Sequence, residues 1–243
     1  RDPGMVTSLR TYGLGWRYLT QPDYRTLFIN ACQDFGINTW QCQIDQTVYA
    51  KLTEDPATVA ASIQAFNAAG IQVWACWDDG IDIGPTWDDV VDGLTWHEFF
   101  DAVLKWNKDH PTARFTALQF DLEPADSATE QEHKTHLEQV YANMQTMRAH
   151  TVDGTETIES QNLPVVMLAQ PKWANSLIAP AFSQVVSVVD AWQIDHYRWG
   201  DASHSYGIDY SIEVEAAVQA IVDSQARYFT VSTSCYELAK NDE

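Results

Sequence analysis

The sequence predicts an α/β fold in which parallel strands, each followed by a helix, close into a (β/α)8 barrel of the TIM type. Short apolar runs rich in β-branched and aromatic residues alternate along the whole chain with segments of helical period. An open doubly wound sheet is disfavoured because Gly13 and Gly15 lack the third glycine of a phosphate-binding loop after the first strand. The long segments that follow two strands, residues 78–93 and 198–210, are those that would form the active-site face of a barrel.

Seven strands are expected, at residues 7–17, 37–45, 71–78, 115–123, 164–170, 190–197 and 227–235. Apolar residues three and four positions apart, such as Val59, Ile63 and Phe66, predict the helices between them. Pro180 predicts a short or irregular helix in the fifth crossover. No eighth strand is visible, so we expect a single domain over residues 1–243 whose eighth unit is incomplete or irregular.

Composition excludes several classes of protein. The chain has 243 residues, 45% of them hydrophobic, which is enough for a full core. Its 34 acidic and 14 basic residues give a formal charge of −20, which disfavours nucleic acid as a partner. No apolar run approaches the roughly 20 residues of a membrane span. The four cysteines form no CxxC pair, so we expect buried packing or one disulfide bond among Cys32, Cys42, Cys76 and Cys235.

A Gln-x-Asp pattern recurs on the second, fourth and sixth predicted strands. Residues two apart on a strand share a face, so each Gln and Asp would point toward the barrel axis. Inward side chains of alternate strands share layers in such barrels, so the three carboxylates are expected to converge in one cavity. The members of the pattern are Gln43, Asp45, Gln119, Asp121, Gln193 and Asp195.

The fourth strand continues this pattern to Glu123, immediately before Pro124. Two carboxylates as close as Asp121 and Glu123 do not both ionise easily, so the pKa of one should rise, as a general acid requires. The scarcity of Lys and Arg nearby argues against a simple ion pair at this strand end. We therefore expect Glu123, Asp121 and Asp195 to be catalytic, with Tyr197 facing the same cavity.

Aromatic residues gather at the predicted strand ends, where sugar rings could stack on them. Together with the polar strand positions they predict a carbohydrate cleft. The expected substrate-binding residues are Tyr197, Asp45, Gln119, Gln193, Trp77, Asp78, Trp173 and Trp199.

The segment from Leu118 to Pro124 resembles the fourth-strand signature of the chitinase-like family 18 glycoside hydrolases. In that family the final Glu donates the proton and the preceding Asp assists it, which implies these roles for Glu123 and Asp121. Upstream, Ala117, Leu118 and Gln119 stand where the family has further Asp and Gly residues. The run from Asp195 to Tyr197 is loosely similar to the family's Tyr-Asp pair on the sixth strand, in another order. The resemblance thus implies the wider class of barrel glycosidases.

The expected function is hydrolysis of a polysaccharide or oligosaccharide, amino-sugar polymers included, with no cofactor or metal and an extracellular or cell-surface location. Two alternatives stay open. A divalent ion among Asp45, Asp121, Glu123 and Asp195 would make the protein a lyase or isomerase. A barrel that only binds glycans, without catalysis, is the other.

Overall fold

The computed structural model describes residues 8–11, 13–78, 85–91, 93–122, 128–169, 175–194 and 228–231, together with residues 124, 173 and 220. In this part of the chain one parallel sheet has seven strands in the order β1-β2-β3-β6-β7-β8-β9. The strands are β1 (Ser8–Thr11), β2 (Thr39–Gln43), β3 (Gln72–Asp78), β6 (Leu118–Asp121), β7 (Val165–Ala169), β8 (Ala191–Ile194) and β9 (Tyr228–Val231).

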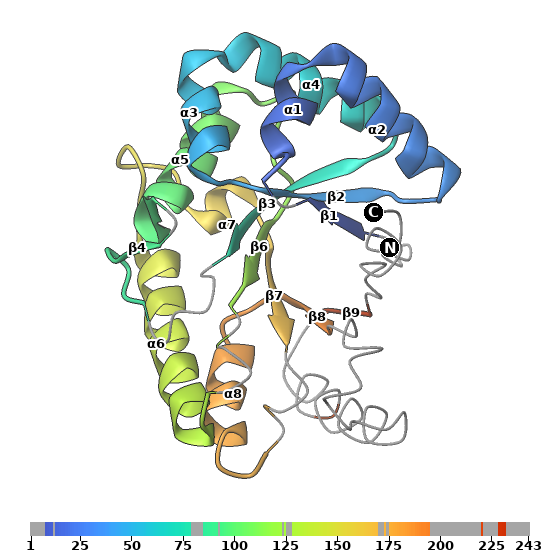
Figure 1. Ribbon diagram of the computed structural model, residues 1–243. Helices are drawn as coiled ribbons and strands as arrows, with labels where there is room; N and C mark the ends of the chain where they lie inside the picture. Colours follow the sequence, from blue (N-terminus) through green and yellow to red (C-terminus); the bar gives the residue numbers. More distant parts are fainter. Residues whose placement is uncertain are drawn as a thin grey trace.

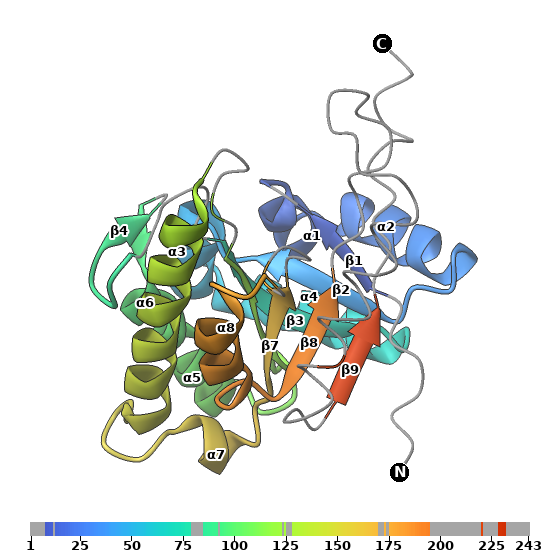
Figure 2. The ribbon, with the colours of Figure 1, turned by 90° about the horizontal axis from the view of Figure 1, so that it is seen from below.

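Each of these strands lies inside one of the seven predicted ranges, so the predicted alternation is confirmed. Every neighbouring pair in the sheet is parallel. Among the described residues no pairing joins β9 to β1, and the fold is an incomplete barrel of the predicted type. Figures 1 and 2 show the strands turning progressively around a common axis.

A hydrogen bond across the inner face demonstrates how strongly the sheet curls. The side-chain amide of Gln41 on β2 donates to Gln193 Oε1 on β8 over 2.7 Å. Four strand-to-strand steps separate β2 from β8 in the sheet order. In a flat sheet those steps would place the strands about 19 Å apart. Only a sheet rolled toward closure brings the two amides together.

Helices cover the outer face of the curled sheet, as Figure 1 shows, and they fall into two groups along the chain. One group consists of α1 (Gly15–Thr20), α2 (Pro22–Asp34), α3 (Gln46–Glu54) and α4 (Pro56–Ala68). The other consists of α5 (Trp96–Asp109), α6 (Glu130–Ala149), α7 (Ile158–Gln161) and α8 (Ala179–Val186). The predicted short helix in the fifth crossover is α8, and Pro180 lies in its first turn, where its missing N–H costs no helical hydrogen bond.

The main hydrophobic core lies between the sheet and these helices. Strand register puts Trp40, Trp77, Phe120, Met167 and Trp192 on the helix-facing side, and each is at most 2% exposed. Their alternate neighbours face the barrel interior. There Trp74, Ala117 and Val166 form a small apolar cluster, in which Trp74 is in register with Gln41 and Val166 with Gln119.

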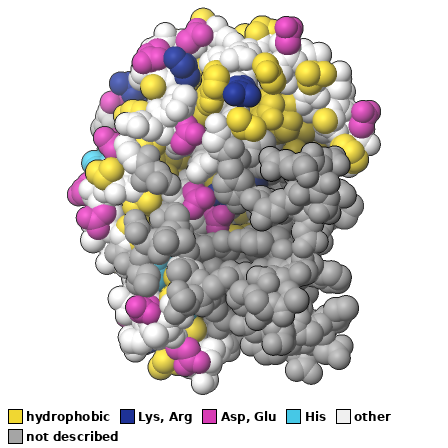
Figure 3. Space-filling model, viewed as in Figure 1, with side chains coloured by type: hydrophobic (Ala, Val, Ile, Leu, Met, Phe, Trp, Pro, Cys, Tyr) yellow, Lys and Arg dark blue, Asp and Glu magenta, His cyan; other side chains and the backbone are white. Residues whose placement is uncertain are grey.

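Two details differ from a simple reading of the apolar pattern. Leu27 and Phe35 continue the helical stripe of α2 but are 68% and 79% exposed, so only Phe28 and Cys32 form its buried face. Hydrophobic side chains accordingly appear on the surface over α2 in Figure 3.

The long segment after β3 carries a short hairpin, β4 (Val90–Val91) and β5 (Leu94–Thr95). Within the described residues no helix is both long and apolar enough to cross a membrane.

Candidate active site

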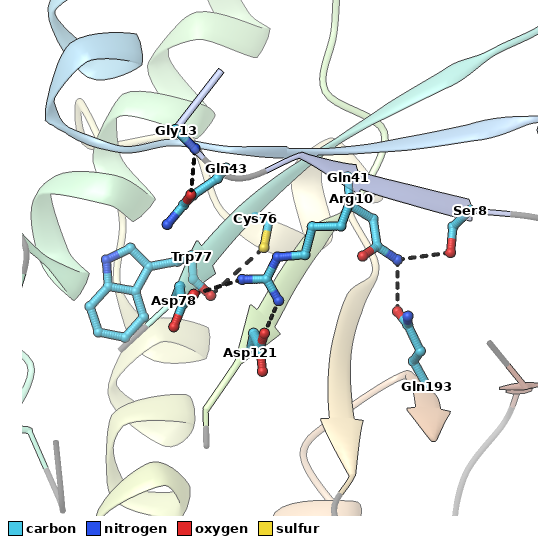
Figure 4. A network of polar contacts seen from close by, with 10 residues as sticks. All are labelled: Ser8, Arg10, Gly13, Gln41, Gln43, Cys76, Trp77, Asp78, Asp121 and Gln193. Carbon is cyan, nitrogen blue, oxygen red and sulfur yellow. Dashed lines mark hydrogen bonds and ion pairs between the residues drawn. The ribbon is translucent and has the colours of Figure 1, made fainter. Parts of the chain in front are cut away.

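The polar network at the C-terminal ends of the strands is centred on Arg10 of β1. Its Nη1 donates to Oδ2 of Asp121 on β6, and its Nη2 lies 3.0 Å from Oδ2 of Asp78 on β3. Figure 4 shows the guanidinium between the two carboxylates, inside the curled sheet. The side chains of Arg10, Asp78 and Asp121 are 11%, 19% and 6% exposed. A forked guanidinium is well suited to hold two carboxylates in fixed orientations.

This arrangement corrects one expectation from the sequence. The scarcity of Lys and Arg argued against an ion pair at the end of the fourth predicted strand, yet Asp121 has one. The cation comes from β1, which is distant in sequence but faces the same interior. The strand register shows why one guanidinium reaches both carboxylates: Asp78 and Asp121 are partners in the β3–β6 pairing and share a face. Asp121 therefore points inward, as strand alternation predicts.

Two polar groups close to the pair lack internal partners. Oδ1 of Asp121 is buried and accepts no hydrogen bond from any described residue. Gln119, two residues earlier on the same face, is 0% exposed, and neither its Oε1 nor its Nε2 has a partner in that part of the chain. Buried polar atoms are nearly always paired in folded proteins. Unpaired atoms on an inner strand face are therefore candidates for contact with a ligand.

A second polar layer lies beside this network. The amide of Gln41 donates both to Ser8 Oγ over 3.0 Å and to Gln193 Oε1 over 2.7 Å. Near the strand ends, Gly13 donates its backbone N–H to Gln43 Oε1 over 3.2 Å. Gln41, Gln43, Gln119 and Gln193 thus all lie on the inner face, as their strand parity requires.

Asp45 is placed differently from the sequence-based expectation. It lies beyond β2 and caps α3, with its carboxylate accepting the backbone N–H of Val48 over 2.8 Å. An aspartate at a helix N-terminus satisfies an otherwise unpaired donor. The structure thus shows a capping role for Asp45, because the strand ends before the alternating pattern reaches it, and the expected substrate-binding role stays a prediction.

Trp77 and Trp173 also belong to the core and not to a substrate cleft. Trp77 has the opposite strand parity from Asp78, is 2% exposed and packs on Trp96 with ring centroids 5.2 Å apart. Trp173 is 0% exposed, packs on Phe182 and donates from Nε1 to His133. Both corrections have the same cause: large aromatic residues supply buried area between sheet and helices.

The remaining predicted site residues lie outside the described residues. They are Glu123, Asp195, Tyr197 and Trp199.

The cysteines of the described region are buried thiols. Cys32, Cys42 and Cys76 form no disulfide bond among themselves. Burial raises the pKa of Cys76, which faces the interior near Arg10, to about 12. Burial also raises the pKa of Cys42 well above its usual value. These thiols are protonated at neutral pH, which is the inert form. Cys235 lies outside the described residues.

Sequence reasoning missed Arg10 and Gln41. A signal for each was present in the residue pattern. Ser8 and Arg10 share a face of the first predicted strand, and an arginine inside a strand requires a partner. Gln41 precedes Gln43 by two residues and therefore shares its inward face.

Comparisons with known proteins are consistent with this architecture. Neither a scan against protein-family models nor a search of curated proteins finds a match. Among solved structures, the spore cortex-lytic enzyme SleL of Bacillus cereus has a TM-score of 0.52 and 13% identity, covering 94% of this chain and 49% of SleL. The chain thus spans about half the length of SleL.

Two further solved structures are less similar. A chitinase from Chromobacterium violaceum has a TM-score of 0.48 and 12% identity, covering 92% of this chain and 67% of the chitinase. The D-psicose 3-epimerase of Clostridium cellulolyticum has a TM-score of 0.43 and 10% identity, covering 94% of this chain and 84% of the epimerase. The match to SleL shows a shared fold, and an identity this low extends no further than the fold.

Proposed function

We propose that the chain is a glycoside hydrolase that cleaves a polysaccharide or oligosaccharide, with Glu123 as the proton donor. The observation that carries the proposal is the position of Asp121 on the inner face, at the C-terminal end of β6. Active sites of (β/α) barrels are built at these strand ends. Glu123 follows Asp121 by two residues and completes the Asp-x-Glu motif of the resemblance described above.

The proposed chemistry uses the carboxylates in different roles. Glu123 protonates the glycosidic oxygen as the bond from that oxygen to the anomeric carbon breaks, and water finally adds to the anomeric carbon. Asp121 is held by Arg10 through Oδ2, which leaves the buried Oδ1 to accept a hydrogen bond from substrate or from Glu123. Asp121, Asp195 or an amide of the substrate would stabilise the positive charge that develops on the sugar.

The contacts of Asp45, Asp78 and Asp121 argue against a metal-dependent lyase or isomerase. Arg10 already supplies the cation between Asp78 and Asp121. Asp45, another member of the metal set considered from the sequence, caps α3 instead. An extracellular or cell-surface location remains part of the proposal, because polymeric carbohydrate is found there.

The test is hydrolysis of a polysaccharide panel, including acetylated and deacetylated amino-sugar polymers, with and without a chelator. We expect Glu123→Gln to lower the rate about 10²–10⁴-fold. Glu138→Gln is the matched control, since Glu138 is on the solvent side of α6 in an ion pair with Lys134. Activity lost with the chelator would instead favour the metal enzyme. Glycan binding without hydrolysis by the wild type would favour a binding barrel.

A further inference from the structure

Three side chains of metal-ligating types converge where the first two turns of α5 meet the end of α6, away from the inner face of the sheet. They are His97, Asp101 and His150, and one potential ligand atom from each lies within 4.8 Å of the other two. We propose that these residues bind a divalent transition-metal ion, with zinc as the best fit.

The positions in the fold explain the convergence. His97 and Asp101 are four residues apart on α5, so their side chains share one face of the helix. His150 is the C-cap residue that immediately follows α6. His150 Nε2 lies 2.9 Å from Asp101 Oδ1, and His97 Nε2 lies 3.5 Å from Asp101 Oδ2. Ligand atoms around a tetrahedral zinc ion are about 3.4 Å apart. Small side-chain rotations would therefore complete the site.

A fourth residue orients one of the ligands. His97 Nδ1 lies 3.2 Å from Asp88 Oδ1, which favours a proton on Nδ1 and leaves the Nε2 lone pair directed toward Asp101. A carboxylate behind a histidine is the usual outer partner of a zinc ligand. The rings are also held by packing, since Trp87 stacks on His97 at 5.2 Å and the His150 ring lies perpendicular to His97 at 4.8 Å.

The donor set and its charge select the class of ion. Two imidazoles and one carboxylate suit zinc and similar transition metals better than calcium or magnesium, which prefer oxygen ligands. In the described part of the chain, neither Asp88 nor Asp101 is paired with Lys or Arg, so their charge is available to a cation. The ligand side chains are 28–40% exposed, which gives an ion access from solvent. Water would occupy the fourth position.

The ion would join the start of α5 to the end of α6 on the outer layer of the barrel. This role is independent of the proposed glycosidase chemistry, which uses residues of the inner strand face. A His97→Gln/His150→Gln variant is therefore expected to keep wild-type hydrolysis at temperatures well below unfolding, whether or not zinc is added.

The test is calorimetric titration of the metal-free 243-residue chain with zinc chloride, with the visible absorption of added cobalt(II) as a second measurement. We expect one ion per chain in the wild type and a tetrahedral cobalt spectrum. The His97→Gln/His150→Gln variant should lose about 100-fold or more in affinity, since outer partners alone cost about 10–100-fold. His110→Gln is the matched control, because His110 packs on Trp106 and is no member of the cluster.

Circular dichroism would confirm that each variant is folded. Added zinc should raise the unfolding temperature of the wild type and of His110→Gln, but not that of the His97→Gln/His150→Gln variant. Two results would overturn the proposal. One is a wild type that is folded but binds no zinc. The other is a folded double variant that binds zinc as tightly as the wild type, which would place the ion at other residues.

Discussion

Arg10 and Asp121 form an ion pair inside the curled sheet, although their strands are not neighbours. Strands β2 and β3 lie between them in the sheet order, and Asp78 of β3 binds the same guanidinium. The pair thus links the first strand to the strand that leads into the proposed acid, Glu123. It also compensates two carboxylates at a largely buried position.

Removing this cation should destabilise the protein. Arg10→Met removes the cation from the buried carboxylate of Asp121 and from the half-buried one of Asp78, and breaking a buried pair costs about 3–5 kcal/mol. Arg10→Lys should cost less but not be neutral, because an ammonium cannot match the fork geometry. Urea denaturation measures both. Arg17→Met is the control: Arg17 lies over the rings of Trp16 and Tyr24, and its loss should cost about 1 kcal/mol or less. Equal effects at both arginines would contradict the structural role of Arg10.

The bond between Gln41 and Gln193 should be measurable as coupling across the barrel. Gln41→Leu leaves the buried Oε1 of Gln193 without this donor, which should cost about 1–3 kcal/mol. Gln193→Leu should cost a similar amount, and the double variant should cost clearly less than the sum. Strictly additive effects in a double-mutant cycle would mean that β2 and β8 do not meet. Gln64→Leu, on the exposed face of α4, should change stability by about 0.5 kcal/mol or less.

Strand positions were predictable from the sequence because the hydrophobic pattern records which segments are buried. All seven predicted ranges contain an observed strand, and the inward parity of Gln119 and Asp121 follows from the same alternation. The pattern fails where a strand stops earlier than its residues indicate. Asp45 has the predicted strand parity in the sequence, yet β2 ends at Gln43 and Asp45 is already the N-cap of α3.

Partners that come from distant strands were not predictable from local patterns. The pairing of Arg10 with Asp121 depends on the degree of sheet curl, which no single segment encodes. The aromatic residues failed for a different reason. Trp77 and Asp78 are adjacent, so only one of them can face inward, and the packing of Trp77 against Trp96 determines which. The convergence of His97 with His150 likewise requires the tertiary arrangement of two helices.

We expect the Gln119 side chain to lower the free energy of unfolding and to contribute to substrate binding. Its side-chain amide is buried without a partner among the described residues, so Gln119→Met should stabilise the protein by about 1 kcal/mol or more. If the amide contacts sugar in the proposed site, the same variant should raise KM for the polysaccharide. Gln33→Met, at an exposed position of α2, should change neither quantity. Destabilisation by Gln119→Met would mean that the amide has an internal partner, and an unchanged KM would remove it from the site.

Cys76 should make the protein lose stability in alkaline solution. Burial raises its pKa from 9.0 to about 12, so the folded state keeps a proton that the unfolded state releases above pH 9. Stability from this group is fully present below that pH, and it is lost as the pH rises toward 12. Between pH 8 and pH 10 the loss amounts to about 1.4 kcal/mol. Urea denaturation at both pH values should therefore show a smaller alkaline loss in Cys76→Ala than in the wild type, by about this amount. Identical losses in the two proteins would mean that the thiol ionises as readily in the folded chain as in the unfolded one.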